Sequence, residues 1–298
     1  MKKINMAPLL SPEWANQGES FLTTQYGAYI KLKTQKVQLL RLEFAENYLG
    51  LSFVITVDDV RENIIIDKNF LSIVLPNDDE HIVEIILRNV DGNNSYFWEH
   101  PVIINNMLSD DGQVMQLIED DDSFITFVGD SITAGEAMAT DGNHPELSFP
   151  YLVAQELKKP LNRIAYGGTG LTANAPFQTP SAIDALWHVS NNVERVRTKT
   201  NLVVVNYGTN DFNYHATDES FAFGLRIYLL ELIKRFHNAR IILLIPFNGA
   251  FKHIIEKETQ RFSCFEVVDT TGWLVDLSHV HPNIEEHSII AKNILKGI

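Results

Sequence analysis

The stretch Phe124-Ile-Thr-Phe-Val-Gly-Asp-Ser-Ile-Thr-Ala-Gly135 places a hydroxyl group at the end of an apolar run. Such a run is typical of a buried strand, and Gly129 permits the tight turn by which a chain leaves a sheet. Ser131 would then present its oxygen and its backbone N–H to one small volume, as a rigid, accessible nucleophile must. Because Gly-Asp-Ser also occurs in ordinary turns, this interpretation needs support from elsewhere in the chain.

Three later segments supply the other groups that acyl transfer from a serine requires. They are Gly167-Gly168-Thr169-Gly170, Gly208-Thr209-Asn210-Asp211 and His281-Pro282-Asn283. With Gly-Asp-Ser-Ile they resemble, in order and approximate spacing, the four sequence blocks of the SGNH, or GDSL-type, hydrolase superfamily of esterases and lipases. The resemblance covers roughly residues 123 to 298, and four ordered blocks are far more specific than any one of them.

The resemblance implies a role for one residue of each block. Ser131 would be the nucleophile, His281 its general base, and the oxyanion would be bound by the backbone N–H groups of Ser131 and Gly168 and the side-chain amide of Asn210. We expect glycine at 168 because a side chain there would crowd an approaching carbonyl group. Simpler alternatives are a surface histidine, a flexible glycine turn and an asparagine that caps a turn.

The segment before His281 departs from the common superfamily pattern. Many members have an aspartate three residues before the histidine, where this chain has Ser278, and Asp276 lies five residues before. The ring would be oriented either by Asp276, if the loop bends, or by a backbone carbonyl group in a Ser–His dyad. His279 and His281 are spaced so that they could share a metal, but no third ligand completes the set, so neither a metal nor another cofactor is predicted.

The chain changes its hydrophobic pattern near residue 120. Before that point, short alternating runs separated by Asn, Asp and Gly turns predict antiparallel strands of a β-sandwich. These runs are Ile30–Lys33, Leu40–Phe44, Leu51–Val57 and Ile82–Leu87. We expect two domains, residues 1–120 and 121–298, with the acidic run Glu119–Asp122 as a solvated connector.

After Ser123 apolar strands alternate with helical segments, which predicts a parallel α/β sheet covered on both faces. The strands are Phe124–Val128, Leu202–Val205, Ile241–Ile245 and Phe265–Val268, and the helices are Phe149–Leu157, Phe221–Phe236 and Pro282–Leu295, with Pro282 at the first helical position. The resemblance implies a three-layer α/β/α hydrolase domain preceded by a jelly-roll-like sandwich. Cys264 cannot form an internal disulfide bond and is expected within a buried strand.

The bulk composition excludes several classes of partner. With 24 basic and 38 acidic residues the formal net charge is −14, which disfavours nucleic acids and anionic membranes. Neither a signal peptide nor a membrane-spanning stretch is visible, so a cytoplasmic protein is predicted. Oligomerisation is left open.

A β-rich domain before this hydrolase half looks like the two-domain carbohydrate acetylesterases of the second carbohydrate-esterase family. Leu171 after the glycines and Phe212 after Asn-Asp support this finer resemblance. A small-molecule or oligosaccharide ester would be the substrate. Four aromatic residues are candidates for a sugar-stacking platform: Trp187, Phe212, Tyr214 and Trp273. The alternatives are an esterase or lipase for longer acyl chains and an inert carbohydrate-binding protein.

Overall fold

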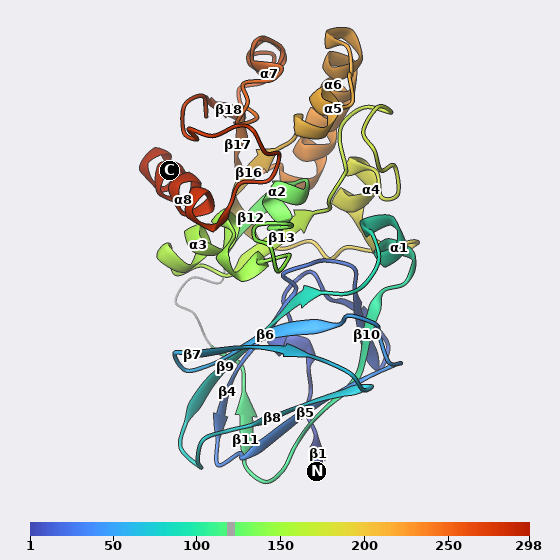
Figure 1. The fold of residues 1–298 in the computed structure, drawn as a ribbon, viewed down its shortest axis with the longest axis vertical. Helices are drawn as coiled ribbons and strands as arrows, with labels where there is room; N and C mark the ends of the chain where they lie inside the picture. Colours follow the sequence, from blue (N-terminus) through green and yellow to red (C-terminus); the bar gives the residue numbers. More distant parts are fainter. Residues whose placement is uncertain (118–122) are drawn as a thin grey trace. The chain divides into compact units, whose positions relative to one another are not determined.

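The computed structural model describes residues 1–117 and 123–298 (Figure 1). The chain folds into two compact units. The first unit contains the described residues up to 117 together with Val189–Val196, and the second contains residues 123–188 and Arg197–Ile298. The predicted acidic connector, Glu119–Asp122, lies outside the described residues.

The first unit is built from two antiparallel sheets. One has the strand order β2-β3-β10-β5-β8, with β1 paired to β10, and the other has the order β11-β4-β9-β6-β7. The four predicted strands are confirmed as β4, β5, β6 and β9. The elements of this unit are β1 (Lys2–Lys3), a 3-10 helix (Ala7–Leu9), β2 (Ala15–Gln17), β3 (Ser20–Thr23), β4 (Tyr29–Gln35), β5 (Leu39–Phe44), β6 (Ser52–Val57), β7 (Val60–Ile65), β8 (Phe70–Val74), β9 (His81–Asn89), α1 (Asn94–Glu99), β10 (Val102–Ser109) and β11 (Gln113–Met115).

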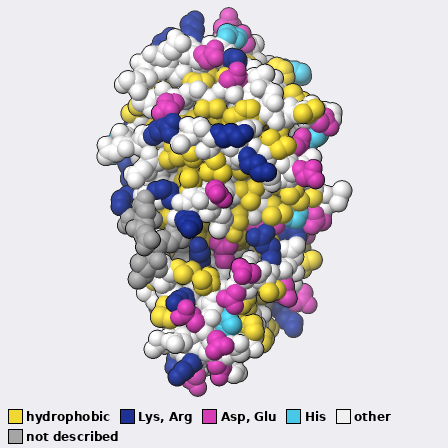
Figure 2. Space-filling view, turned by 90° about the vertical axis from the view of Figure 1, so that its left-hand side faces the viewer, with side chains coloured by type: hydrophobic (Ala, Val, Ile, Leu, Met, Phe, Trp, Pro, Cys, Tyr) yellow, Lys and Arg dark blue, Asp and Glu magenta, His cyan; other side chains and the backbone are white. Residues whose placement is uncertain are grey.

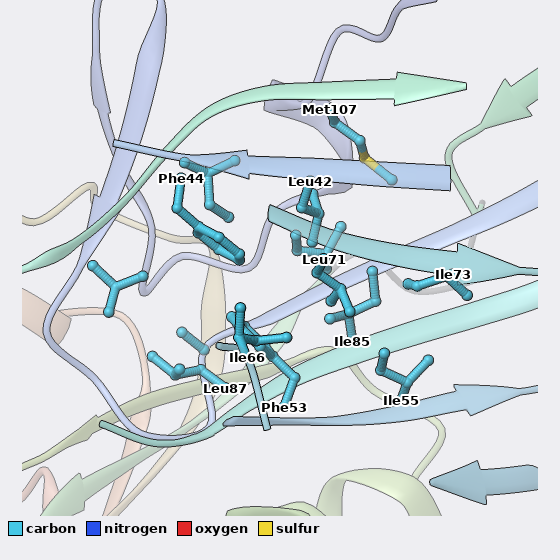
Figure 3. Packing of buried hydrophobic residues seen from close by; sticks show 14 of the residues in the cluster. Leu42, Phe44, Phe53, Ile55, Ile66, Leu71, Ile73, Ile85, Leu87 and Met107 are labelled. Atoms are coloured by element: carbon cyan, nitrogen blue, oxygen red, sulfur yellow. The ribbon is translucent and has the colours of Figure 1, made fainter. Parts of the chain in front are cut away.

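Buried and partly covered side chains alternate along the strands, and the buried ones form the core between the two sheets. In β5 the residues Leu40, Leu42 and Phe44 are buried while their neighbours are only partly covered. Figure 3 shows Leu42 and Phe44 packing toward side chains of the opposite sheet, among them Phe53 and Ile85. Phe44 and Phe53 stack with their ring centroids 5.7 Å apart. Burial of such side chains, at about 1.5–3 kcal/mol each, holds the sandwich together.

A hairpin from the middle of the chain belongs to the first unit. β14 (His188–Ser190) and β15 (Val193–Glu194) pair with each other, and Val189 packs with Ala15 and Leu22. The hydroxyl of Ser190 donates to the carbonyl of Trp98 at 3.0 Å. The second half of the chain therefore returns once to the β-rich unit before it continues.

The second unit has one parallel sheet with the strand order β13-β12-β16-β17-β18 and helices on both faces, α3 and α8 on one side and α4 and α6 on the other (Figure 1). The predicted α/β/α fold is thereby confirmed. The elements are β12 (Phe124–Gly129), α2 (Ser131–Ala134), a 3-10 helix (Pro145–Leu147), α3 (Phe149–Glu156), β13 (Leu161–Ala165), α4 (Ala182–Trp187), β16 (Thr200–Asn206), α5 (Thr209–Asn213), α6 (Asp218–Phe236), β17 (Arg240–Leu244), α7 (Lys252–Thr259), β18 (Phe265–Val268) and α8 (Ile284–Gly297).

The order of the strands decides where the predicted site residues meet. β12 lies between β13 and β16, and all three run parallel. Ser131 follows β12, Gly168 follows β13 and Asn210 follows β16, so the three residues leave the same carboxyl edge of the sheet. Such an edge, where the strand order reverses, is the usual place of a site in an open α/β sheet.

Two local predictions were wrong. Pro282 is not the first helical residue, because Asn283 caps α8 and forms a reciprocal capping box with Glu286. Cys264 is exposed and precedes β18 instead of lying within it. The apolar residues around Cys264 belong to β18 and to the segment just before it. Because β18 is at the edge of the sheet, less of its surface is covered.

On the face drawn in Figure 2, Lys and Arg side chains stand among acidic and hydrophobic ones. Within residues 1–117 and 123–298, no helix combines the length and the apolar character that crossing a membrane requires.

His287 gives the fold a testable pH dependence. Its ring is fully buried, its Nδ1 accepts the backbone N–H of Phe149 at 3.1 Å, and burial lowers its pKa to about 3. The unfolded chain binds this proton below about pH 6.5 but the folded chain does not, so stability falls as the pH drops between these values. Replacing His287 with Gln should remove about 3 kcal/mol of the loss in unfolding free energy between pH 6.5 and pH 4. Urea denaturation of the wild type and of His287→Gln at both pH values measures the unfolding free energies. An equal loss in the two proteins would contradict the lowered pKa of His287 as the cause.

Candidate active site

Ser131 is held where β12 turns into α2. It is the first residue of α2, and the carboxylate of Asp130 caps this short helix by accepting the N–H of Ile132 at 3.0 Å. Only glycine fits at position 129, two residues before Ser131, because a Cβ atom there would lie 2.2 Å from the hydroxyl of Thr133. The side chain of Ser131 is itself largely buried. Its backbone is therefore fixed by packing, as a precise nucleophile requires.

A buried arginine holds the other end of α2. Arg163, on β13, donates to the carbonyl of Ala134 at 3.0 Å and to the carbonyl of Pro145 at 2.9 Å, and it also bonds the hydroxyl of Ser148 at 2.9 Å. The guanidinium group satisfies carbonyl groups that a helix leaves unpaired at its carboxyl end. The sequence gives no sign of this role, since Arg163 reads as one polar residue in a strand.

His281 reaches Ser131 from the loop between β18 and α8. Its Nε2 lies 2.9 Å from the Oγ of Ser131, although 150 residues separate the two in sequence. A neutral ring that accepts the serine proton at Nε2 must carry its own proton on Nδ1. Within the described residues, Nδ1 has no hydrogen-bond partner. The arrangement is thus a Ser–His dyad.

Asp276 faces a different histidine. Its carboxylate accepts the N–H of Ser278 at 2.8 Å and lies 3.6 Å from the Nδ1 of His279. The Nε2 of His279 in turn lies 2.9 Å from Glu286, which raises the pKa of His279. Burial, followed by the charge of His279, lowers the pKa of His281. His281 is therefore a neutral base over a wider acidic range than an ordinary histidine.

The predicted oxyanion donors lie at the same edge of the sheet. In the part of the chain that the structure describes, the backbone N–H groups of Ser131 and Gly168 have no acceptor. The amide of Asn210 donates to the carbonyl of Thr169 at 2.8 Å with one of its two hydrogens. One hydrogen of the amide and two backbone N–H groups thus remain for an oxygen ligand.

The reason for glycine at 168 differs from the expected one. Gly168 has φ +74°, and a Cβ atom on it would lie 2.2 Å from the ring of Phe177. The backbone N–H of Phe177 also donates to the carbonyl of Gly168 at 3.1 Å. Left-handed backbone and the packing of Phe177 therefore require glycine here.

Two carboxylates, those of Glu136 and Asp211, hold the glycine loop. Glu136 accepts the N–H of Gly167 at 2.9 Å. Asp211 accepts the N–H of Leu171 at 3.0 Å and both the N–H and the hydroxyl of Thr172, at 2.8 and 2.7 Å. The position of Asp211 at the end of the Gly-Thr-Asn-Asp block was the signal for it, whereas Glu136 has no signal in the sequence.

The carboxylates of this region bond backbone groups of the helix end and of the glycine loop. Asp130 caps α2, and burial raises its pKa to about 7, with the charges of Glu136 and Asp211 adding to the effect. Asp211 is bound to the glycine loop, and burial raises its pKa as well. Among residues 1–117 and 123–298, no group of three or more His, Cys, Asp or Glu side chains is arranged to hold a metal ion.

A cavity of about 260 Å³ opens beside the dyad. Its walls include Ile132, Thr209 and Pro282, which are the immediate neighbours of the dyad residues and of Asn210 in sequence. Polar walls come from Asn213 and Asn248, and also from Asp276, Ser278 and His279. The cavity therefore offers hydrogen-bonding groups and apolar surface to a molecule placed at Ser131.

The four aromatic candidates have different surroundings. Phe212 and Tyr214 are 52% and 50% exposed near the end of α5, where a ligand can contact them. The ring centroid of Trp273 lies 6.5 Å from that of Phe247, which lines the cavity. Trp187 instead bonds Glu231 through its indole N–H at 3.0 Å, and two arginine side chains lie over its ring.

Residues 127–263 match the model of the GDSL-like Lipase/Acylhydrolase family. The resemblance found in the sequence blocks is thereby confirmed for residues 127–263, which contain three of the four blocks. The matched range contains Ser131, Gly168 and Asn210, whereas His281 lies beyond it. No curated protein sequence matches the chain.

Solved structures of similar fold cover nearly the whole chain. A family two carbohydrate esterase from Cellvibrio japonicus has a TM-score of 0.81 at 18% identity, with 98% of this chain and 95% of that chain covered. A family two carbohydrate esterase from Clostridium thermocellum, in complex with cellohexaose, has a TM-score of 0.80 at 17% identity, with 97% of each chain covered. An acetyl xylan esterase from the rumen bacterium Butyrivibrio proteoclasticus has a TM-score of 0.73 at 14% identity, with 99% of this chain and 94% of that chain covered.

The charge of His279 should be measurable in the titration of His281. Replacing His279 with Gln removes a positive charge beside His281, so the pKa of His281 should rise toward that of a free histidine. NMR titration of the imidazole signals gives both values. The control is His237→Gln, at the end of α6 and near the opposite edge of the sheet, which should leave the pKa of His281 unchanged. An unchanged pKa in the His279 variant would contradict the electrostatic coupling.

Proposed function

We propose that this protein is a serine esterase that removes short acyl groups, acetyl above all, from a carbohydrate. The 2.9 Å contact between His281 and Ser131 is the observation that carries the proposal. A serine hydroxyl becomes a nucleophile only beside a base, and that base is in place. The family match supports the same class of enzyme, a carboxylic ester hydrolase.

The first half of the reaction forms an acyl-enzyme. The Oγ of Ser131 attacks the ester carbonyl carbon while the Nε2 of His281 takes the hydroxyl proton. The carbonyl oxygen becomes an oxyanion, which the free N–H groups of Ser131 and Gly168 and the amide of Asn210 bind. The carbon–oxygen bond to the sugar then breaks, and His281 returns its proton to the departing sugar oxygen.

The second half releases the acid. Water takes the place of the sugar, His281 removes a proton from it, and the water oxygen attacks the acyl carbon. The bond between that carbon and the Oγ of Ser131 then breaks, and His281 returns the proton to Ser131. Among the described residues, 1–117 and 123–298, no carboxylate forms a hydrogen bond or an ion pair with His281 that would share the positive charge the ring carries during each step. The lowered pKa of His281 keeps the ring ready as a base at neutral and mildly acidic pH.

Three observations favour a neutral carbohydrate ester as the substrate. The similar structures are those of carbohydrate esterases, one of them in complex with cellohexaose. The cavity beside the dyad combines polar side chains, both amides and the charged Asp276 and His279, with apolar walls, as hydroxyl groups and the C–H face of a sugar require. The net charge of −14 disfavours strongly anionic substrates.

Ser131→Ala tests the nucleophile. Hydrolysis of p-nitrophenyl acetate should fall by at least about a thousandfold, because the residual rate of such enzymes comes from the oxyanion donors and binding alone. Ser288→Ala, a partly buried serine within α8, serves as the control and should keep its rate. Hydrolysis by Ser131→Ala at the wild-type rate would refute the proposal.

The length of the acyl group separates the proposal from its nearest alternative. We expect kcat/KM to fall from acetyl to butyryl to octanoyl esters of p-nitrophenol, because the cavity at the dyad is small and partly polar. A preference for octanoyl esters would instead assign the protein to lipases for longer chains.

A further inference from the structure

The first unit contains a cleft of its own, with a volume of about 450 Å³. It lies between the turn that joins β5 to β6 and the segment that runs from the end of β9 through α1. Side chains of Glu46, Asn47 and Asp91 contribute polar walls, and Tyr96 and His100 contribute aromatic ones. We infer that this cleft is a binding site for a neutral sugar residue, separate from the residues of the dyad.

A rigid aromatic surface is the first support. The rings of Tyr96 and His100 stack with centroids 4.1 Å apart and planes 15° apart, and Tyr96 is 52% exposed. The carboxamide of Asn93 accepts the N–H of Tyr96 at 2.8 Å, and the Nδ1 of His100 donates to the carbonyl of Tyr96 at 3.0 Å. The pair is therefore held in place before any ligand arrives, which lowers the entropy cost of binding.

Polar groups beside this surface are the second support. Within residues 1–117 and 123–298, the carboxylates of Glu46 and Asp91 have neither a hydrogen-bond nor an ion-pair partner. The Nε2 of His100 is left as an acceptor, since its proton is on Nδ1. Carboxylates accept hydrogen bonds from hydroxyl groups, and the amide of Asn47 can both donate and accept. Neighbouring hydroxyl groups on a sugar ring match this set.

The charge of the cleft limits the chemical class of sugar that it can bind. No Lys or Arg is among its walls, while two carboxylates are. Uronic acids and phosphorylated sugars would therefore be repelled. A neutral pyranose offers a C–H face to Tyr96 and hydroxyl edges to the carboxylates, and thus uses both kinds of wall. A ligand that is only a cation would leave the amide of Asn47 unused.

Affinity electrophoresis of the full chain tests this inference. Native gels that contain soluble xylan, glucomannan or hydroxyethyl cellulose should retard the wild-type protein. Tyr96→Ala should weaken this binding by about threefold to tenfold, the loss expected of one stacking surface. Glu46→Gln, which keeps the shape and removes the charge, should weaken it as well. Val74→Ala, an exposed apolar residue on β8, is the control and should migrate as the wild type does.

Ester hydrolysis provides an independent readout. Both cleft variants should hydrolyse p-nitrophenyl acetate at the wild-type rate, so failure of the proposed esterase function would leave the gel result intact. The inference is overturned if no neutral polysaccharide retards the wild type, or if Tyr96→Ala and Glu46→Gln are retarded as strongly as the wild type. Retardation by the polycation chitosan alone would assign the cleft to cations and would also overturn it.

Discussion

The hydrogen bond between Ser131 and His281 depends on one constraint, the central place of β12 in a parallel sheet. Because β12 lies between β13 and β16, the loops after all three strands meet at one edge. His281 reaches the same edge from the loop that follows β18, a strand parallel to the others, and this loop ends in a capped helix. The dyad is therefore the product of strand order and of the start of α8, and no local segment contains it.

Buried polar side chains turn this meeting of loops into a rigid arrangement. Asp130, Arg163 and Asp211 are each buried, and each bonds backbone groups that a turn or a helix end leaves unpaired. Burying such groups without partners costs about 1–3 kcal/mol each, so their hydrogen bonds fix the loops firmly. Asp130 combines two opposed effects, because burial raises its pKa to about 7 while its carboxylate caps α2, the helix that begins with Ser131.

The sequence predicts those features that depend only on residues that are close together in the chain. The strand that precedes Ser131 is visible because parallel strands covered on both faces are continuous apolar runs. The family resemblance was readable for a similar reason, since each block contains its residues side by side. The β-sandwich was also predictable, because its strands alternate between buried and exposed residues.

Other features depend on contacts between distant residues and left no local pattern. The partner of Asp276 turned out to be His279, which spacing alone did not decide. Gly168 is required by the ring of Phe177, nine residues later. The return of residues 189–196 to the first unit is set by packing against Ala15 and Leu22. The cleft in the first unit likewise depends on two distant segments, one around Glu46 and one around Tyr96. Taken alone, the first is an ordinary turn and the second a turn followed by a short helix.

Labelling with a fluorophosphonate tests most directly whether Ser131 and His281 act as a unit. A fluorophosphonate reacts with a serine only when a neighbouring base activates its hydroxyl. Mass spectrometry of the treated protein should show one adduct, located on Ser131, and His281→Ala should reduce its rate of formation by at least about a thousandfold. An unlabelled protein, or an adduct on Ser131 that forms equally fast without His281, would contradict the account.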